Sequence, residues 1–305
     1  MFAYALRRLA GAVPTVFVII AIAFFMIRLA PGGPFDQERS VPPEIRANLE
    51  RAYHLDEPLG RQFLRYLGDI LTGDFGPSFR YKDFTVTQLL LDGFPVSLQL
   101  GLAAMVIAVV VGFGAGALAA LRRNSAIDVA TMSLAMTGIA VPNFVVAPVL
   151  TLTLGVWLAL LPVGGWGGIE HAILPVVALA LPEIAFVARL TRGSMLEVLR
   201  ADFVRTARAK GLSESAMVVR HALQAAALPV LSFLGPTTAA VITGSVVIEQ
   251  IFGIPGIGRY FVQGALNRDY TLVMGVVVFY AVIIIGLNLL VDLLYPLFDP
   301  RVRHD

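Results

Sequence analysis

The side chains in this sequence that could do chemistry are few and widely separated. There are four histidines, far apart in the sequence, and the only lysines are Lys82 and Lys210. A phosphate-binding loop of the P-loop type needs a lysine directly after a glycine, whereas these two follow Tyr81 and Ala209. The patterns H-E-x-x-H and G-x-S-x-G are also absent. We therefore expect a chain that is not an enzyme and that itself binds no metal, nucleotide or other cofactor.

Polar side chains inside apolar stretches are the next candidates. They are Gln99, Asn143, Glu183, Glu249, Asn288 and Asp292. Placing an ionisable group within a bilayer costs roughly 2.5–3.5 kcal/mol on insertion scales, so its presence needs a reason. For Glu183, Glu249 and Asp292 two interpretations stay open: a structural one, capping or hydrogen bonding between helices, and a role in a solute pathway. The residues that we expect on a translocation path or gate are Asn143, Glu249 and Asp292.

A basic segment, RTARAKGLSESAMVVRHALQAA (Arg205 to Ala226), lies between two apolar runs. The Ala, Arg and Leu content of Glu197–Ala209, which overlaps the start of this segment, predicts a helix there. Gly211 can supply the left-handed residue that ends this helix, and Ser213 can cap a second helix over Glu214–Leu228. Two short helices joined by a tight bend would form a stiff projection that fits a groove in another protein. The alternative is a plain surface loop that carries charge.

The composition indicates which elements position these residues. The 305-residue chain is 57% hydrophobic and 14% charged, with mean hydropathy +0.80, whereas a soluble domain carries roughly a quarter charged residues. Its net charge of +2 gives no reason to expect a nucleic-acid partner. Six stretches approach the length of about 20 apolar residues that a helix needs to cross a bilayer. They are Leu9–Leu29, Val96–Leu121, Val129–Leu161, Ile173–Leu190, Pro229–Ile251 and Leu272–Tyr295.

These stretches predict an all-α membrane protein with six transmembrane helices, because backbone groups in lipid must be paired within their own segment. The first apolar run is too long for a signal peptide, so we expect it to remain as an anchor. Prolines 142 and 148 should kink or break the third span, and prolines 175 and 182 the fourth. Gly112 and Gly116 form a small-residue motif that allows close helix packing.

Arginines in the short loops predict the orientation. The loop RRNSAID carries Arg122 and Arg123, whereas PVGGWGGIEH, on the other side of the next span, carries neither lysine nor arginine. Because short cytoplasmic loops are enriched in these residues, we expect both termini and the basic segment to be cytoplasmic.

Two segments on the outer side have amphipathic patterns. In the first, EIRANLERAYHL (Glu44–Leu55) predicts a short helix, and LGRQFLRYLGDIL predicts another with an apolar face. The residues that recur on this face are Leu59, Phe63, Leu64, Leu67, Ile70 and Leu71. The region is either a helical cap on the membrane surface or a docking platform for an external partner, and the two are compatible. The second segment, Arg259–Leu266, is either a short interfacial helix or part of a Gly/Pro turn with aromatic anchors.

The basic segment resembles the EAA loop of ABC importer permeases, in which Glu-Ala-Ala is followed by three residues and a glycine. Here the pattern reads Arg205-Thr206-Ala207, then Arg208-Ala209-Lys210, then Gly211. The acidic first position is missing, and Gln224 stands where many relatives have proline. The segments YHLDEPL, GDFGPSFRYKD, MTGIAVPNFVVAP and ITGSVVIEQIFGIPGIGRYFVQGALNRDYTLV are similar to the oligopeptide branch of that family. The resemblance covers nearly the whole chain.

This resemblance implies the type I ABC importer permease fold with a helical periplasmic insertion after the first helix. Residues 1–30 would be the cytoplasmic N-terminus and first helix, 31–95 the insertion, 96–295 the permease core and 296–305 a cytoplasmic tail. A coupling loop would lie at 197–228. In it, Thr206, Ala207, Gly211, Leu212 and Ser213 would form the bend that sits in an ATPase groove, with Arg205, Arg208 and Lys210 at its rim.

The resemblance also implies partners and cargo. A homologous second permease subunit, two ATP-binding subunits that hold ATP and Mg, and a periplasmic peptide-binding protein would complete an importer of oligopeptides in the bacterial inner membrane. The same machinery carrying dipeptides, glutathione or nickel chelates is an alternative. An ion-driven secondary carrier is a more distant one, because the sequence shows neither internal repeats nor a string of midplane acids.

Overall fold

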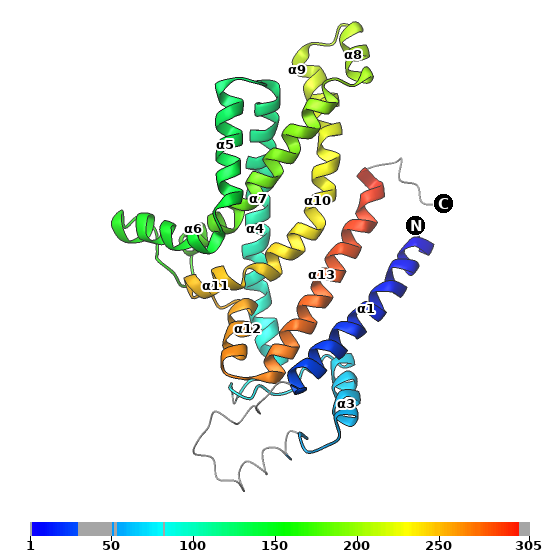
Figure 1. Ribbon diagram of the computed structural model, residues 1–305, viewed down its shortest axis with the longest axis vertical. Coiled ribbons are helices and arrows are strands. Elements are labelled where there is room, and N and C mark those ends of the chain that lie inside the picture. Colours follow the sequence, from blue (N-terminus) through cyan, green and yellow to red (C-terminus); the bar gives the residue numbers. More distant parts are fainter. Residues whose placement is uncertain (1, 30–50, 52–53, 82, 299–305) are drawn as a thin grey trace.

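The computed structural model describes residues 2–29, 51, 54–81 and 83–298, and nearly all of them lie in helices (Figure 1). The long helices are α1 (Phe2–Leu29), α4 (Val86–Leu121), α7 (Ile169–Val198), α10 (Leu223–Gly244) and α13 (Tyr270–Phe298). Five helical segments are long and apolar enough to cross a membrane, or six if one bent pair counts as a span. The predicted all-α membrane fold is confirmed.

The second span begins earlier than the apolar pattern predicts, at Val86 instead of Val96. Thr85 caps this helix in a reciprocal arrangement: the Gln88 N–H donates to Thr85 Oγ1 (3.2 Å), and the Thr85 N–H donates to Gln88 Oε1 (3.0 Å). Pro95 lies inside the helix. The cap, and not the start of the apolar run, therefore sets where α4 begins.

The third predicted span, Val129–Leu161, is a bent pair of helical segments, as its prolines predict. Helix α5 (Ala126–Ala140) ends before Pro142, and the chain then turns by 102° into α6 (Asn143–Leu150) and the π-helical segment η1 (Thr151–Trp157). Val141 has the extended conformation (φ −92°, ψ 116°) that a residue before proline prefers. The expected break at Pro142 is thus confirmed, while Pro148 lies inside α6.

The fourth predicted span, unlike the third, is not interrupted at its prolines. Helix α7 is continuous through Pro175 and Pro182, so neither proline breaks it. A proline removes one backbone hydrogen bond from a helix interior, at a cost of about 3 kcal/mol. Buried neighbours on both sides of these prolines, such as Leu174 and Ala185, pack against other helices and hold the segment in place.

The centre of the bundle is the contact between α4 and α7. At Gly112, an added β-carbon would lie 2.7 Å from the Ile184 carbonyl oxygen, and at Gly116 it would overlap the backbone of Ala188. Gly114, which faces away, has open space beside it. The small-residue motif therefore serves packing within this chain, as the sequence predicts.

Short helices occupy the two ends of the bundle. Helix α3 (Leu59–Leu71), α11 (Val246–Phe252) and α12 (Ile257–Leu266) lie toward one end, and α8 (Asp202–Ala209) and α9 (Glu214–Met217) lie at the other, where α4 also turns into α5 (Figure 1). Helices α3 and α12 match the predicted amphipathic helices. On α3, Phe63, Leu67 and Ile70 pack inward, whereas Leu64 and Leu71 are exposed. Most of the expected helix Glu44–Leu55 lies outside the described residues.

Candidate functional site

The basic segment forms an elbow, residues 199–217, at one end of the bundle. The predicted helix Glu197–Ala209 is wrong at its start, because α7 ends at Val198 and α8 begins at Asp202. Between them Ala201 is extended (φ −67°, ψ 150°). No glycine or proline in the sequence marks this break, and local propensity favours a helix throughout, so packing of the side chains on α8 decides it.

The bend at the tip of the elbow has the predicted geometry. Gly211 adopts the left-handed conformation (φ +82°), and its N–H donates to the Arg208 carbonyl oxygen (2.9 Å). Ser213 caps α9, since its Oγ accepts from the Ala216 N–H (3.4 Å). These two contacts reverse the chain between α8 and α9.

The second arm of the elbow is not a separate short helix. Helix α9 continues through the π-helical segment η2 (Val218–Ala222) directly into α10, which passes through Pro229. The predicted break before Pro229 is therefore wrong. Ala226 and Val230, on either side of this proline, are buried, so packing maintains the helix there. A continuous rod thus leads from the elbow into the bundle.

An ion pair closes the elbow across its bend. Arg208 Nε donates to Glu214 Oε1 (2.8 Å), and Nη2 donates to Oε2 (3.2 Å). This hydrogen bonding raises the pKa of Arg208 and keeps its guanidinium charged. Because both side chains are exposed to water, the pair orients the arms more than it stabilises them.

The inner face of the elbow is packed on the bundle. Val204 and Met217 are fully buried and share a hydrophobic cluster with Met195 of α7 and Ala120 of α4. Ala207 belongs to the same cluster. A force on the elbow would therefore pass to α4, α7 and α10 through close-packed side chains.

The residues that the resemblance assigns to coupling divide between two faces. Arg205, Thr206, Arg208, Lys210, Gly211 and Ser213 are exposed, and Leu212 is half-buried. Ala207 lies on the inner face, so its side chain is not available to a partner. Phe203 (48% exposed) and Val219 (65% exposed) are apolar residues on the outer surface that sequence reasoning missed. Phe203 could have been suspected, because Val204 and Ala207 already fill the buried face of α8.

The three candidates for the path or gate lie in different settings. Glu249 of α11 is fully buried and accepts hydrogen bonds from Ser97 Oγ (2.7 Å), Ser245 Oγ (2.5 Å) and the Gly258 N–H (2.8 Å). It thereby ties α4, α11 and α12 together, which fits the structural interpretation of this residue. Asn143 is half-buried at the start of α6. Asp292 belongs to α13, and its side chain lies outside the described residues.

Sequence reasoning also missed a partly buried ion pair at the end of the bundle that carries the elbow. Asp128 of α5 receives two hydrogen bonds from Arg192 of α7, at 2.6 and 2.8 Å, and one from the Asn124 N–H at 2.9 Å. The pair fixes α5 against α7 just below the α4–α5 turn. Its members are far apart in the sequence and share no motif, so only the fold brings them together.

Comparison with known proteins identifies the family to which a chain with this arrangement belongs. Residues 112–304 match the model of the binding-protein-dependent transport system inner membrane component, and residues 1–101 match the N-terminal model of the same membrane component. The chain belongs to this family. The permease is 52% identical to the oligopeptide transport system permease protein OppB of Salmonella typhimurium and to that of Escherichia coli, with complete coverage of both chains in each case.

Other relatives agree with this placement. The permease is 47% identical to the dipeptide transport system permease protein DppB of Bacillus subtilis, over 99% of this chain and 98% of that one. Among solved structures, a chain from the crystal structure of an amino acid ABC transporter with histidines superimposes with TM-score 0.53 at 20% identity, covering 71% of the permease and 95% of that chain. At this identity the structural match shows the fold alone, and that fold is the one expected for an ABC importer permease.

Proposed function

We propose that the permease is one membrane subunit of an ATP-driven importer that moves oligopeptides from the periplasm to the cytoplasm. The observation that carries this proposal is the 52% identity to OppB along the entire chain, with no part of either protein left unmatched. The cargo named for those relatives is thereby transferred to this chain.

The elbow is the proposed contact with separate ATPase subunits. Its outer surface combines exposed Arg205, Thr206 and Lys210 with apolar Phe203 and Val219, a mixture suited to a partly apolar groove. Its inner face is anchored in the bundle, so closure of two ATPase subunits would move α10 as a rod. The remaining exposed members of the coupling set, Arg208, Gly211 and Ser213, maintain the shape of the bend, and half-buried Leu212 lies within it.

The partners follow from this role. ATP and Mg would be held by two ATP-binding subunits, a homologous second permease would complete the pathway, and a periplasmic peptide-binding protein would deliver cargo to the end that carries α3 and α12. Residues 31–95 would form the insertion on that side, 96–295 the core, 197–228 the coupling loop, and 1–30 and 296–305 would carry the cytoplasmic termini. Asn143, Glu249 and Asp292 remain proposed path or gate residues.

Orientation in the inner membrane can be tested directly because the chain contains no cysteine. Lys210→Cys places a single thiol on the elbow, and Ala265→Cys places one on exposed α12 at the opposite end. A membrane-impermeant maleimide added to intact spheroplasts should label the second variant and not the first. The opposite pattern would reverse the proposed topology.

Transport itself is tested in proteoliposomes. The chain, its second permease and the two ATPase subunits are reconstituted, with the binding protein and radiolabelled tetrapeptide on one side and ATP on the other. We expect uptake that requires ATP and is blocked by vanadate, and no uptake by the chain alone. Uptake by the isolated chain, or uptake driven by an ion gradient without ATP, would contradict the proposal.

Dipeptides are the second candidate cargo, because identity to the dipeptide permease DppB is nearly as high and as complete. Competition in the same vesicles separates the two. If unlabelled dipeptides displace tetrapeptide uptake at equal concentration, dipeptides belong to the cargo range. If they do not, the oligopeptide assignment stands. Glutathione and nickel chelates can be tested in the same way.

A further inference from the structure

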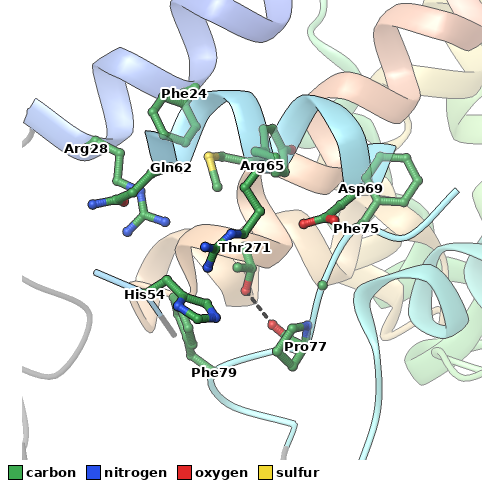
Figure 2. Close-up of a pocket in the computed structure, with 13 residues that line it drawn as sticks. Phe24, Arg28, His54, Gln62, Arg65, Asp69, Phe75, Pro77, Phe79 and Thr271 are labelled. Carbon is green, nitrogen blue, oxygen red and sulfur yellow. Dashed lines mark hydrogen bonds between the residues drawn. The ribbon is translucent and has the colours of Figure 1, made fainter. Parts of the chain in front are cut away.

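A cavity of about 160 Å³ lies at the end of the bundle opposite the elbow. It is bounded by the end of α1, by α3, by the loop that precedes α4, and by the start of α13. Figure 2 shows Arg28 of α1, Gln62 and Arg65 of α3, and His54 around one space, with Thr271 of α13 bonded to the Pro77 carbonyl beside it. No residue assigned to coupling or to the path takes part in this cavity.

Three polar atoms that line the cavity lack partners among the described residues. Gln62 is 8% exposed; its amide nitrogen donates to the carbonyl oxygens of Leu55 (3.1 Å) and Glu57 (2.7 Å), which leaves Oε1 as an unpaired acceptor. The Tyr66 hydroxyl, on a residue 9% exposed, is also unpaired, as is Arg28 Nε. Such buried groups cost about 1–3 kcal/mol each, so three in one cavity call for a ligand.

The charges around the cavity favour an anion at one side of it. Arg65 is neutralised by Glu57, whose Oε1 lies 2.8 Å from Nη2, and His54 Nδ1 lies 3.5 Å from the same oxygen. The Arg28 guanidinium stacks over the Phe24 ring at 5.6 Å and has no carboxylate within ion-pair distance in the described part of the chain. Asp69 also lines the cavity, next to Phe75 in Figure 2.

The hydrogen-bonding groups that line the cavity limit the chemical class of the ligand. Burial raises the pKa of Tyr66, so its hydroxyl stays protonated and can donate. Arg28 and Tyr66 then offer donors to an oxyanion, while Gln62 Oε1 needs a donor from the ligand. Inorganic phosphate at neutral pH still carries a P–OH group, so it can satisfy all three groups, and so can a phosphate ester next to an ammonium or hydroxyl group.

Depth in the membrane indicates where such a ligand comes from. Arg28 lies one residue before the end of the candidate span Arg8–Leu29, at the level where an apolar helix leaves the hydrocarbon. Phospholipid head groups occupy that level, and arginines at helix ends reach toward it.

We propose that this cavity binds the head group of an outer-leaflet phospholipid, with Arg28 and Tyr66 donating to phosphate oxygens and Gln62 accepting from the ammonium or hydroxyl group. Bound lipid would join α1, α3 and α13 at the outer surface. The choice of the outer leaflet rests on the topology given in the proposed function, whereas the cavity and its binding groups do not depend on the cargo or on coupling to ATPase subunits.

The test measures lipid retention by the full chain. Delipidated protein in detergent is titrated with phosphatidylethanolamine, or with inorganic phosphate, and bound molecules are counted by native mass spectrometry. We expect one phosphatidylethanolamine per chain. Arg28→Gln should weaken its binding at least about tenfold, and Tyr66→Phe by about three- to tenfold, from the loss of a charge-assisted and a neutral hydrogen bond. Arg61→Gln, the same charge change on the exposed side of α3, should have no effect.

The outcomes separate the possible sources of the ligand. Equal lipid binding by wild type and both cavity variants would overturn the proposal, as would the absence of any bound lipid. Binding of inorganic phosphate without lipid would overturn the lipid assignment and leave a free-anion site. Because Tyr66→Phe retains the aromatic ring, lipid binding by this variant tests the proposed site even if Arg28→Gln fails to fold.

Discussion

Gly211 offers a graded test of whether the elbow must keep its shape to transmit force. Its φ of +82° lies in the left-handed region, and a β-carbon added there meets nothing within 4 Å. A substitution therefore introduces backbone strain without a steric clash. Asparagine tolerates the left-handed conformation, alanine tolerates it less well, and a β-branched residue such as valine is disfavoured most.

The expected magnitude follows from that strain. A side chain in the left-handed region costs roughly 1–2 kcal/mol, with asparagine below this range and valine at or above its upper end. The chain can either absorb this cost or relax Gly211 out of the left-handed region, which would rotate α8 away from α9. Because Val204 and Met217 are fully buried on the two arms, relaxation also disturbs the anchor of the elbow.

The assay is the amount of peptide imported per ATP hydrolysed in proteoliposomes, together with thermal unfolding of the detergent-solubilised chain. We expect coupling to fall in the order glycine, asparagine, alanine, valine, while the chain still inserts in the membrane. Gly193→Val is the matched control: Gly193 is exposed on α7, has open space, and has no positive φ, so the same change introduces no such strain.

Two results would refute the reasoning. Wild-type coupling in Gly211→Val without a loss of thermal stability would show that the bend can relax and does not transmit the motion. A larger loss in Gly211→Asn than in Gly211→Val would show that side-chain size or chemistry matters at this position, and not backbone strain.

Other substitutions test packing and polar contacts. Gly116→Ala should destabilise the chain by about 1–3 kcal/mol through overpacking against α7, whereas Gly114→Ala, which faces open space, should be neutral or slightly stabilising. Thermal unfolding compares the two variants, and equal losses of stability would contradict the role of Gly116 in packing. Glu249→Leu should cost about 1–3 kcal/mol because it leaves a buried N–H donor unpaired, and Glu249→Gln should cost less; uptake that falls in both variants without a change in stability would favour the path role instead. Arg208→Gln and Glu214→Gln should leave the melting temperature nearly unchanged. A large drop at low salt that disappears in high salt would contradict this and show that the exposed ion pair stabilises the elbow.

Local patterns account for the features that sequence analysis predicted correctly. The left-handed glycine at position 211, the cap at Ser213 and the break at Pro142 each depend on one residue and its immediate neighbours. The amphipathic helix over Leu59–Leu71 follows from the spacing of its own apolar residues. Such features need no knowledge of distant contacts, because backbone sterics and helix periodicity act within a few residues.

Errors in the prediction occurred where packing outweighs a local preference. The chain breaks between Val198 and Asp202 without a glycine or proline, and α7 and α10 pass through prolines that sequence rules treat as helix breakers. In each case buried side chains from other helices supply the free energy that local propensity lacks. The same holds for Asp128 and Arg192, which no spacing rule connects.

The sequence by itself determined that this protein is helical, lies in a membrane and has a bend at Gly211, because composition, periodicity and single-residue conformational limits are local properties. Its family followed from the resemblance of its segments to those of known transport permeases. Only the tertiary structure decided that Ala207 faces inward, that Glu249 links three helices and that Arg28, Gln62 and Tyr66 surround one cavity. These relations join residues distant in sequence, and they exist only because close packing of helices brings specific faces together.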